Sequence, residues 1–312
     1  MPSEPDHPLD SRFDHIAFKG SPPDHYPAIS PPGSPPVARA QPIRIPSADE
    51  LEQHPMEDVA FVRRVLRMAG IRADGYRLTP LVRRIPACLR ALRARDQETA
   101  DRIVANDVHR LQLAVNALLI GTTSFFRDHT VFQQLDQTVV PALLTARERP
   151  RIWSAACSDG SELASIAMLF AKHGGIERSE FLGTDCRSSA IAFAAEGRYP
   201  LESADLLPPD MSERFLLRNE KGCRVHPSIR SRLNWKLADI LAEPAGNAWD
   251  MILCRNLAIY LHPHQAHQLW IELHAALSPG GYLVVGKAEK PQIDGLYRVS
   301  TCIYRKDLHS PS

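Results

Sequence analysis

Residues 151–174 read RIWSAACSDGSELASIAMLFAKHG, and this stretch contains the pattern that determines the fold. Residues 151–157 are a short apolar run, as expected for a buried strand, and residues 161–174 have the spacing of an amphipathic helix. Strand-like and helix-like segments alternate further along the chain in EFLGTD (180–185), SSAIAFAAEG (188–197), WDMILC (249–254), HPHQAHQLWIELHAAL (262–277) and, after the turn SPGG, GYLVVG (281–286). This alternation predicts a parallel sheet with helices on both faces, so residues 145–306 are expected to form a doubly wound α/β domain.

An all-helical domain is expected before the sheet, over residues 49–144. Apolar residues recur there at three- and four-residue intervals in three places, at about 59–66, 78–95 and 107–120. In the second of these, Thr79 and Pro80 are typical of an N-cap and a first helical residue, and Pro86 predicts a kink.

Two other segments differ from these domains. Twelve of the 26 prolines fall in the first 50 residues; because proline has no amide donor, residues 1–48 are expected to be a disordered tail. The tail could be a plain flexible extension or a docking arm with polyproline-like turns. Residues 211–238 contain two or three β-prone pieces around the turn at 219–222, which predicts a small antiparallel insertion in the α/β domain.

The overall composition is that of a globular protein, with 44% hydrophobic residues and 37 basic against 36 acidic side chains. The near-zero net charge provides no whole-molecule attraction to nucleic acid or anionic membrane. No run reaches the roughly 18 to 20 apolar residues of a membrane span, and the start MPSEPDHPLD is unlike a signal peptide. We therefore expect a soluble cytoplasmic protein with no nucleic-acid partner and no direct membrane insertion.

Positive charge is concentrated in the helical domain. From Arg63 to Arg95 there are ten arginines and one acidic residue, Asp74. This predicts a basic face for an acidic partner, either acidic protein helices or a nucleic-acid backbone, with a plain solvated surface as the alternative. Tyr76 is the one aromatic residue among the arginines, which disfavours single-stranded nucleic acid.

Candidate ligand-binding residues follow the strands, because ligands of open parallel sheets bind beyond the carboxyl ends of the strands. Gly160 and Glu162 follow the first strand. Asp185 lies 25 residues after Gly160, near the separation expected for a carboxylate that accepts both ribose hydroxyls. Asp239 follows LNWKLA, where it could accept from an adenine amino group, and Asn256 follows WDMILC at the same edge.

Some of these residues also have structural explanations, since Asp185 could be a helix N-cap and Glu162 a first-turn helix acid. The loop after the first strand lacks G-x-G-x-x-G, and the chain has no G-x-x-x-x-G-K-[ST]. A dinucleotide or a nucleoside triphosphate is therefore disfavoured, and a nucleoside without phosphates is favoured.

Four segments in order carry a specific resemblance: GTTSFFRD (121–128), SAACSDGSE (154–162), LGTDCRSSAIAFAAEGRYP (182–200) and DMILCRNLAIYL (250–261). Over about residues 55–306 the chain resembles the CheR family of chemotaxis receptor methyltransferases, which are S-adenosylmethionine-dependent glutamate O-methyltransferases. The resemblance implies a Rossmann-like class I methyltransferase domain at 145–312 with a small N-terminal all-helical domain and a β insertion.

The resemblance also implies a site for S-adenosylmethionine. Its cofactor-binding residues would be Gly121, Thr123, Arg127, Gly160, Glu162, Asp185, Asp239, Ile240, Asn256 and Leu257. Arg127 and Tyr260 would be catalytic, with Tyr260 beside the transferred methyl group. The substrate would be an acidic helical region of a chemoreceptor-like protein, which we expect to be recognised by Arg83, Arg84 and Arg90 of a monomeric enzyme.

The chemistry of these side chains agrees with those roles. A guanidinium for the methionine carboxylate and a carboxylate for its ammonium form a complementary pair, which Arg127 and Glu162 would supply. A glutamate acceptor is already ionised at neutral pH, so no general base is needed. No metal site is expected, because His262, His264 and His267 fit the exposed surface of a helix better than a set of ligands.

The chain departs from the family pattern mainly near the cofactor. Gly121 stands where the family has asparagine; Ser161, Leu163 and Ala164 replace residues of G-E-E-P-Y-S, and Lys287 and Ala288 replace those of G-H-S-E. These changes keep Arg127, Glu162 and Asp185. They leave open a second class of function, a catalytically weakened or inactive relative that acts as a regulatory binding module. Methylation of a small molecule or a nucleic acid by the same fold is a third alternative.

Overall fold

The computed structural model describes residues 54–119, 121, 123–243, 246 and 248–308. These residues belong to one compact unit that spans residues 46–312. The tail expected at residues 1–48 lies outside the described residues. Within the described ranges, no helix combines the length and the apolar character that crossing a membrane requires.

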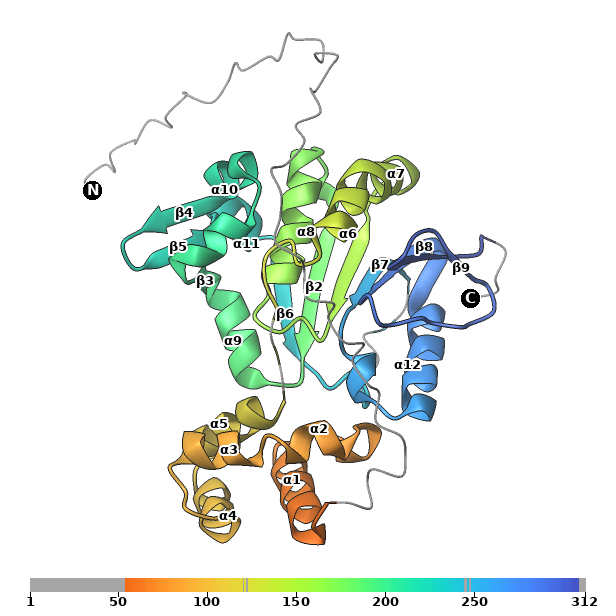
Figure 1. Cartoon of the computed structure of the whole chain (residues 1–312). Helices are drawn as coiled ribbons and strands as arrows, with labels where there is room; N and C mark the ends of the chain where they lie inside the picture. Colours follow the sequence, from red (N-terminus) through yellow and green to blue (C-terminus); the bar gives the residue numbers. More distant parts are fainter. Residues whose placement is uncertain (1–53, 120, 122, 244–245, 247, 309–312) are drawn as a thin grey trace, which may run out of the picture. The chain divides into compact units, whose positions relative to one another are not determined.

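A seven-stranded sheet forms the centre of the α/β region (Figure 1). Its strands lie in the order β6 (Leu233–Leu237), β2 (Glu180–Asp185), β1 (Arg151–Ala155), β7 (Trp249–Cys254), β8 (Leu277–Val285), β10 (Ile303–Lys306) and β9 (Leu296–Arg298). The first five strands pair in parallel, whereas β10 and β9 pair antiparallel. The mainly parallel α/β fold is therefore confirmed. The turn expected at residues 278–281 instead lies within β8, where Gly280 has a φ of 75° and the register with β7 shifts.

Helices cover both faces of the sheet. Alternate residues of each strand point to opposite sides and contact different helices. The helices α8 (Ser161–Lys172), α9 (Ser188–Glu196) and α12 (Pro263–Ala276) connect the parallel strands. Ile152 and Met251 pack in one buried cluster with α8. Their neighbours Trp153 and Ile252 pack in a second cluster with α12. This arrangement confirms the doubly covered sheet expected from the sequence.

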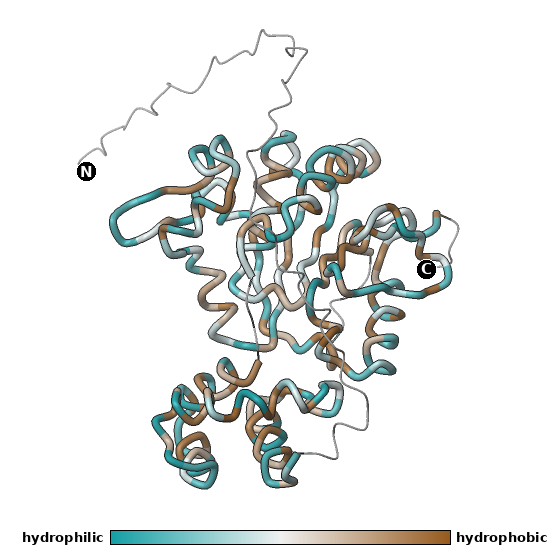
Figure 2. The backbone as a smooth tube through the Cα atoms, viewed as in Figure 1, coloured by the Kyte–Doolittle hydropathy of each residue, from teal (hydrophilic) through white to brown (hydrophobic). Residues whose placement is uncertain are grey.

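The first helices of the described chain are α1 (Met56–Met68), α2 (Leu78–Val82), α3 (Ile85–Leu92), α4 (Gln97–Asn106) and α5 (Val108–Leu118). Hydrophobic and hydrophilic stretches alternate along them (Figure 2). Their buried residues share the cluster that contains α12, so the apolar faces of these helices pack toward that side of the sheet.

The helix expected over residues 78–95 is two helices. Pro86 cannot donate to residue 82 and its ring would clash with that carbonyl, so α2 ends at Val82 and α3 begins at Ile85. Thr79 is not an N-cap as expected, because α2 begins one residue earlier and Thr79 is buried within it. The sequence reasoning also missed α4, which is capped by the Asp96 side chain accepting from the Thr99 amide.

The end of the expected helical domain packs against the sheet. Residues 129–146 form α6 (His129–Gln134), a π-helical turn (Leu135–Val139) and α7 (Val140–Ala146). Their buried side chains lie in the cluster of α8, whereas α1 to α5 lie in the other cluster. The domain boundary at residue 144 itself stays a prediction.

The β insertion is a three-stranded antiparallel sheet of β3 (Arg198–Tyr199), β5 (Gly222–Val225) and β4 (Leu216–Asn219). Two short helices, α10 (Pro209–Phe215) and α11 (Pro227–Arg230), accompany it. The range expected for the insertion, 211–238, needs correction at both ends. Its third strand comes from residues 198–199, and residues 233–237 form β6, because they pair in parallel with β2 in the main sheet.

Candidate functional site

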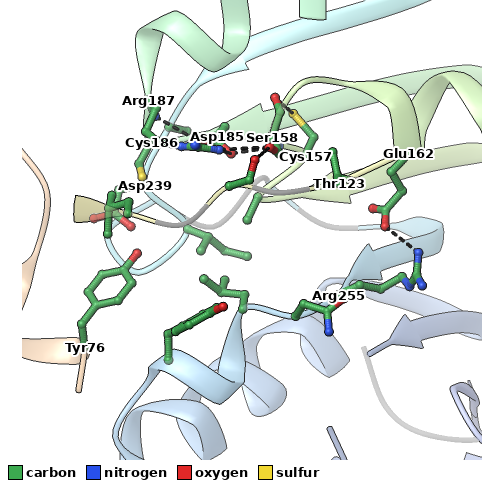
Figure 3. Close-up of a pocket in the computed structure, with 18 of the residues that line it drawn as sticks. Tyr76, Thr123, Cys157, Ser158, Glu162, Asp185, Cys186, Arg187, Asp239 and Arg255 are labelled. Atoms are coloured by element: carbon green, nitrogen blue, oxygen red, sulfur yellow. Dashed lines mark hydrogen bonds and ion pairs between the residues drawn. The ribbon is translucent and has the colours of Figure 1, made fainter. Parts of the chain in front are cut away.

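A pocket of about 960 Å³, partly open to solvent, lies at the carboxyl ends of the central strands. The chain order reverses between β1 and β7, and this is where ligands bind in such sheets. The pocket brings together ten of the residues singled out from the sequence: Gly121, Thr123, Arg127, Glu162, Asp185, Asp239, Ile240, Asn256, Leu257 and Tyr260. Figure 3 shows several of them around the cavity.

Four other predicted site residues lie outside this lining. Gly160 is the N-cap of α8 and has a φ of 81°. A side chain there would meet Ala194 and Trp235 at 2.6 Å, so this glycine permits α9 and β6 to pack closely on the start of α8. Arg83 and Arg90 are exposed on the N-terminal helices, and the half-buried Arg84 donates to the Ala117 carbonyl at 2.5 Å.

The loops that follow β1 and β7 have an unusual backbone conformation. Ala156, Ser158 and Asn256 have φ values of 57°, 53° and 61°, in the left-handed region that residues with side chains seldom adopt. Such strain is retained where the surroundings impose it, which is common at binding sites. Residue type gave a signal only at Asn256, because asparagine adopts this conformation more often than alanine or serine.

The motif T-x-F-F-R has a structural basis in its two phenylalanines. Phe125 packs edge-on to Tyr199 with ring centroids 4.6 Å apart, and Phe126 packs on Phe132 at 5.2 Å. The Phe126 amide also donates to the Ser165 hydroxyl at 3.1 Å. These buried contacts hold the following residue, Arg127, at the pocket wall.

Arg255 joins two acidic groups beside the pocket, and sequence reasoning missed it. Its side chain is 2% exposed; it donates to Glu162 Oε2 at 3.1 Å and to Asp128 Oδ2 at 2.6 Å. Figure 3 shows it reaching toward Glu162. Ser154 donates to the other oxygen of Glu162 at 2.8 Å. The position of Arg255 directly after β7 was a usable signal, because residues that follow the strands lie at the ligand-binding edge.

Asp128 is held in its ionised form by this network. Burial would raise the pKa of Asp128, but the hydrogen bond from Lys287 and the positive charge of Arg255 hold the pKa below its ordinary value. Lys287 Nζ lies 2.7 Å from Asp128 Oδ1. Lys287 is one of the departures from the family pattern, and it adds a cation at this end of the pocket.

Glu289 fixes the loop that carries Asn256 and Leu257. Glu289 Oε2 accepts from the amides of Asn256 at 2.9 Å and Gly286 at 2.7 Å, and Oε1 accepts from the Ala258 amide at 2.8 Å. The carboxyl is 3% exposed, and burial raises its pKa. The buried Asn256 Oδ1 has no hydrogen-bond partner among the described residues.

The N-terminal helices contribute to the opposite end of the pocket. Asp239 accepts from the amides of Arg72 and Leu241 at 3.0 Å each. Tyr76, 4% exposed, lines the pocket and points toward Asp239 (Figure 3). Burial and the nearby acidic groups raise its pKa well above the ordinary value, so its hydroxyl stays protonated.

Tyr260 is positioned by the same N-terminal segment. It ends the turn Ala258–Tyr260, and its carbonyl accepts from the Arg77 amide at 2.8 Å. The His262 amide donates to the Gly75 carbonyl at 3.0 Å. These bonds attach the loop after β7 to the helical region.

Asp185 is the most highly coordinated acid of the pocket. It is 4% exposed and accepts from the Ser158 amide at 2.9 Å and from the Arg187 amide at 3.0 Å. The guanidinium of Arg187 adds two further bonds, from Nε at 3.0 Å and from Nη2 at 3.2 Å. The sequence reasoning did not single out Arg187.

The chemistry of the pocket fits a nucleoside with a zwitterionic tail. Acidic groups lie at the Asp185 end, and Arg127 and Glu162 line the other; apolar residues such as Leu119 and Leu257 also line the pocket. The unpaired Asn256 Oδ1 is a buried acceptor that such a ligand could satisfy. Cys157 and Cys186 also line the pocket, but burial raises the pKa of both thiols, so neither supplies a thiolate at neutral pH. Within the described part of the chain, no group of three or more His, Cys, Asp or Glu is placed to hold a metal ion.

Comparison with known proteins is consistent with this chemistry. The family model described as CheR methyltransferase, SAM binding domain, matches residues 121–302. A chemotaxis protein methyltransferase of Listeria monocytogenes is 29% identical over 252 residues, which cover 79% of this chain and 95% of that protein. Chemotaxis protein methyltransferase 1 of Pseudomonas aeruginosa is 33% identical over 57% of this chain and 69% of its own length. Chemotaxis protein methyltransferase 2 of the same organism is 31% identical over 75% of this chain and 86% of its own length.

Proposed function

The chain belongs to the CheR methyltransferase family, and we propose that it methylates glutamate side chains of a chemoreceptor-like protein, producing glutamate methyl esters and S-adenosylhomocysteine. As a member of this family it is a methyltransferase with S-adenosylmethionine as cofactor. The observation that carries the proposal is the single pocket that Arg127, Glu162, Asp185 and Asn256 line at the carboxyl ends of the strands.

We assign the ends of the cofactor to the ends of the pocket. Asp185 would accept from the ribose hydroxyls, and Asp239 from the adenine amino group between apolar side chains such as Ile240. Glu162 would bind the ammonium of the methionine tail, and Arg127 its carboxylate, because charge-assisted pairs of this kind are strong in partly desolvated sites. Arg255 supports the assignment of Glu162, since it fixes that carboxylate from the side away from Ser154.

S-adenosylmethionine, when bound, supplies a methyl group activated by a positive sulfur. The chain itself would orient the acceptor and exclude water. Tyr260 lines the same pocket as Arg127 and Asn256, where it could contact an acceptor carboxylate. Because that carboxylate is ionised at neutral pH, alignment and partial desolvation suffice and no general base is required.

The N-terminal helices would recognise the substrate. Arg83 and Arg90 are exposed on these helices. Arg84 differs, because its Nε is bound to the Ala117 carbonyl. A basic face of this kind would attract an acidic helical region of a receptor by electrostatic steering. We propose that the enzyme binds this region as a monomer.

One observation favours the alternative of a catalytically weakened regulatory module. The Asp185 carboxylate is bound by the guanidinium of Arg187, which could reduce cofactor affinity. A module that binds its cofactor weakly could still bind an acidic receptor through its helices.

A two-part experiment tests the proposal. Calorimetric titration with S-adenosylhomocysteine should show binding, and a radiolabelled methyl group from S-adenosylmethionine should appear on an acidic receptor fragment as a base-labile ester. The matched control is the same fragment with its acceptor glutamates replaced by glutamine. Binding without transfer to any fragment would favour the regulatory module. No binding at millimolar ligand would exclude the enzyme and leave only a module that binds protein.

A further inference from the structure

Arg187 contacts the Asp185 carboxylate inside the pocket. The Arg187 side chain is 11% exposed, and it lines the same cavity as Asp185. Its Nε donates to Asp185 Oδ1, and its Nη2 lies within hydrogen-bond distance of both Asp185 Oδ2 and the Ser158 hydroxyl. The guanidinium is therefore a built-in ligand of the acid that we assign to the ribose.

The bonds to Asp185 use up its capacity as an acceptor. An ionised carboxylate has about four acceptor positions. The amides of Ser158 and Arg187 fill one position on each oxygen, and the Arg187 guanidinium fills one more on each. A ribose diol that binds both oxygens of Asp185 must therefore replace the guanidinium, because the amides belong to the loop backbone and stay in place.

We propose that Arg187 determines the affinity and the ribose specificity of the cofactor site by competing with the ribose hydroxyls for Asp185. This inference rests on the proposed assignment of Asp185 to the ribose. When the competent arrangement, with Arg187 turned away, is only partly populated, the apparent affinity falls by that fraction.

Gly121 makes the competing arrangement possible. A side chain at position 121 would place its Cβ 2.0 Å from Arg187 Nη1 and 2.2 Å from Nη2. The Gly121 carbonyl also accepts from the Ser158 hydroxyl at 2.8 Å, which joins the two loops around the guanidinium. The loss of the family's asparagine at this position therefore creates the space that Arg187 occupies.

The principal test is calorimetric titration of S-adenosylhomocysteine into the full-length protein and its Arg187→Ala variant. The dissociation constant should fall by about tenfold or more, because two hydrogen bonds to a charged group no longer have to be broken. The matched control is Arg149→Ala, which removes an arginine that is 74% exposed and lies just before β1, at the other end of the strands. Its affinity should equal that of the wild type.

Gly121→Ala gives a second route to the same state, because it displaces the guanidinium while retaining the arginine. The backbone at Gly121 does not require a positive φ, so alanine is compatible with it. The affinity should again rise, and the double variant should bind no more tightly than Arg187→Ala. If Arg187→Ala proves unstable on heating, Gly121→Ala alone tests whether Arg187 competes with the ribose hydroxyls.

A cofactor analogue without the ribose hydroxyls separates competition from a general structural effect. S-(2′,3′-dideoxyadenosyl)homocysteine cannot replace the guanidinium, so Arg187→Ala should leave its affinity unchanged within about twofold. The preference for the diol should therefore grow by about tenfold in the variant.

The outcomes distinguish this inference from the proposed function. Unchanged or weaker binding of S-adenosylhomocysteine by both variants, with normal binding by the wild type, would overturn the competition and leave the methyltransferase assignment intact. An equal gain for both ligands would also overturn it, since the effect would not depend on the hydroxyls. Absence of binding by the wild type and every variant would instead contradict the assignment of the pocket to the cofactor, and this inference with it.

Discussion

Replacing Arg255 by methionine is expected to be strongly destabilising. The substitution keeps most of the volume and removes the charge of a side chain that is 2% exposed. It leaves Glu162 and Asp128, with side chains 9% and 19% exposed, without their shared cation. Removing one partner from a buried pair lowers the free energy of unfolding by about 3 to 5 kcal/mol, and little solvent screening applies at this depth.

The assay is urea unfolding followed by tryptophan fluorescence, for the wild type, Arg255→Met, Glu162→Gln and the double variant. The double variant should lose less stability than the sum of the single losses, because removing the charge of Glu162 relieves part of the unpaired charge. A loss below about 1 kcal/mol for Arg255→Met, the range of exposed pairs, or simple additivity would refute the view that Arg255 holds Glu162 in place.

The same comparison should depend on pH in a defined direction. The pKa of Asp128 is held below its ordinary value of 3.8, so its ionised form contributes stability above that pH. This contribution is lost as the pH falls through the lowered pKa in the folded protein. The difference in the free energy of unfolding between wild type and Arg255→Met should therefore be constant near neutrality. It should become smaller below about pH 3.8, as Asp128 becomes protonated.

Three other variants test separate parts of the site. Arg127→Ala should weaken S-adenosylhomocysteine binding at least about tenfold in calorimetry without unfolding the protein, because the methionine carboxylate loses its guanidinium; unchanged affinity would mean that the match of T-x-F-F-R is vestigial. Glu289→Gln should lower the free energy of unfolding by about 1 to 3 kcal/mol, since an amide donor would face backbone donors, and equal stability in thermal melts would count against its role in fixing the loop after β7. Joint replacement of Arg83 and Arg90 by glutamate should slow methyl transfer to an acidic receptor fragment at low salt while cofactor affinity changes less than about twofold; unaltered transfer would direct the search for substrate contacts to the β insertion.

The order of the layers and the edge that holds the site could be predicted from the sequence alone. Short apolar runs alternating with amphipathic segments are local patterns, and the strands at 151–155, 180–185 and 249–254 coincide with these runs. Once the sheet is known to be parallel, the residues after each strand must meet at one edge. Glu162, Asp185, Asp239 and Asn256 line one pocket as this rule predicts, whereas Gly121, Thr123 and Arg127 precede β1 and were predicted only by the resemblance to the family.

The partners of the buried charges, by contrast, were decided only by the tertiary structure. Arg255 binds Glu162, which is 93 positions away in the chain, and Asp128, which is 127 positions away. Tyr76 comes from a helical region with no expected link to the cofactor edge. Even the contact of Arg187 with Asp185, two residues away, depends on the space left by Gly121. Hydrophobic periodicity depends on neighbours along the chain, whereas the choice of partner for a buried charge depends on which groups the completed fold brings within hydrogen-bond distance.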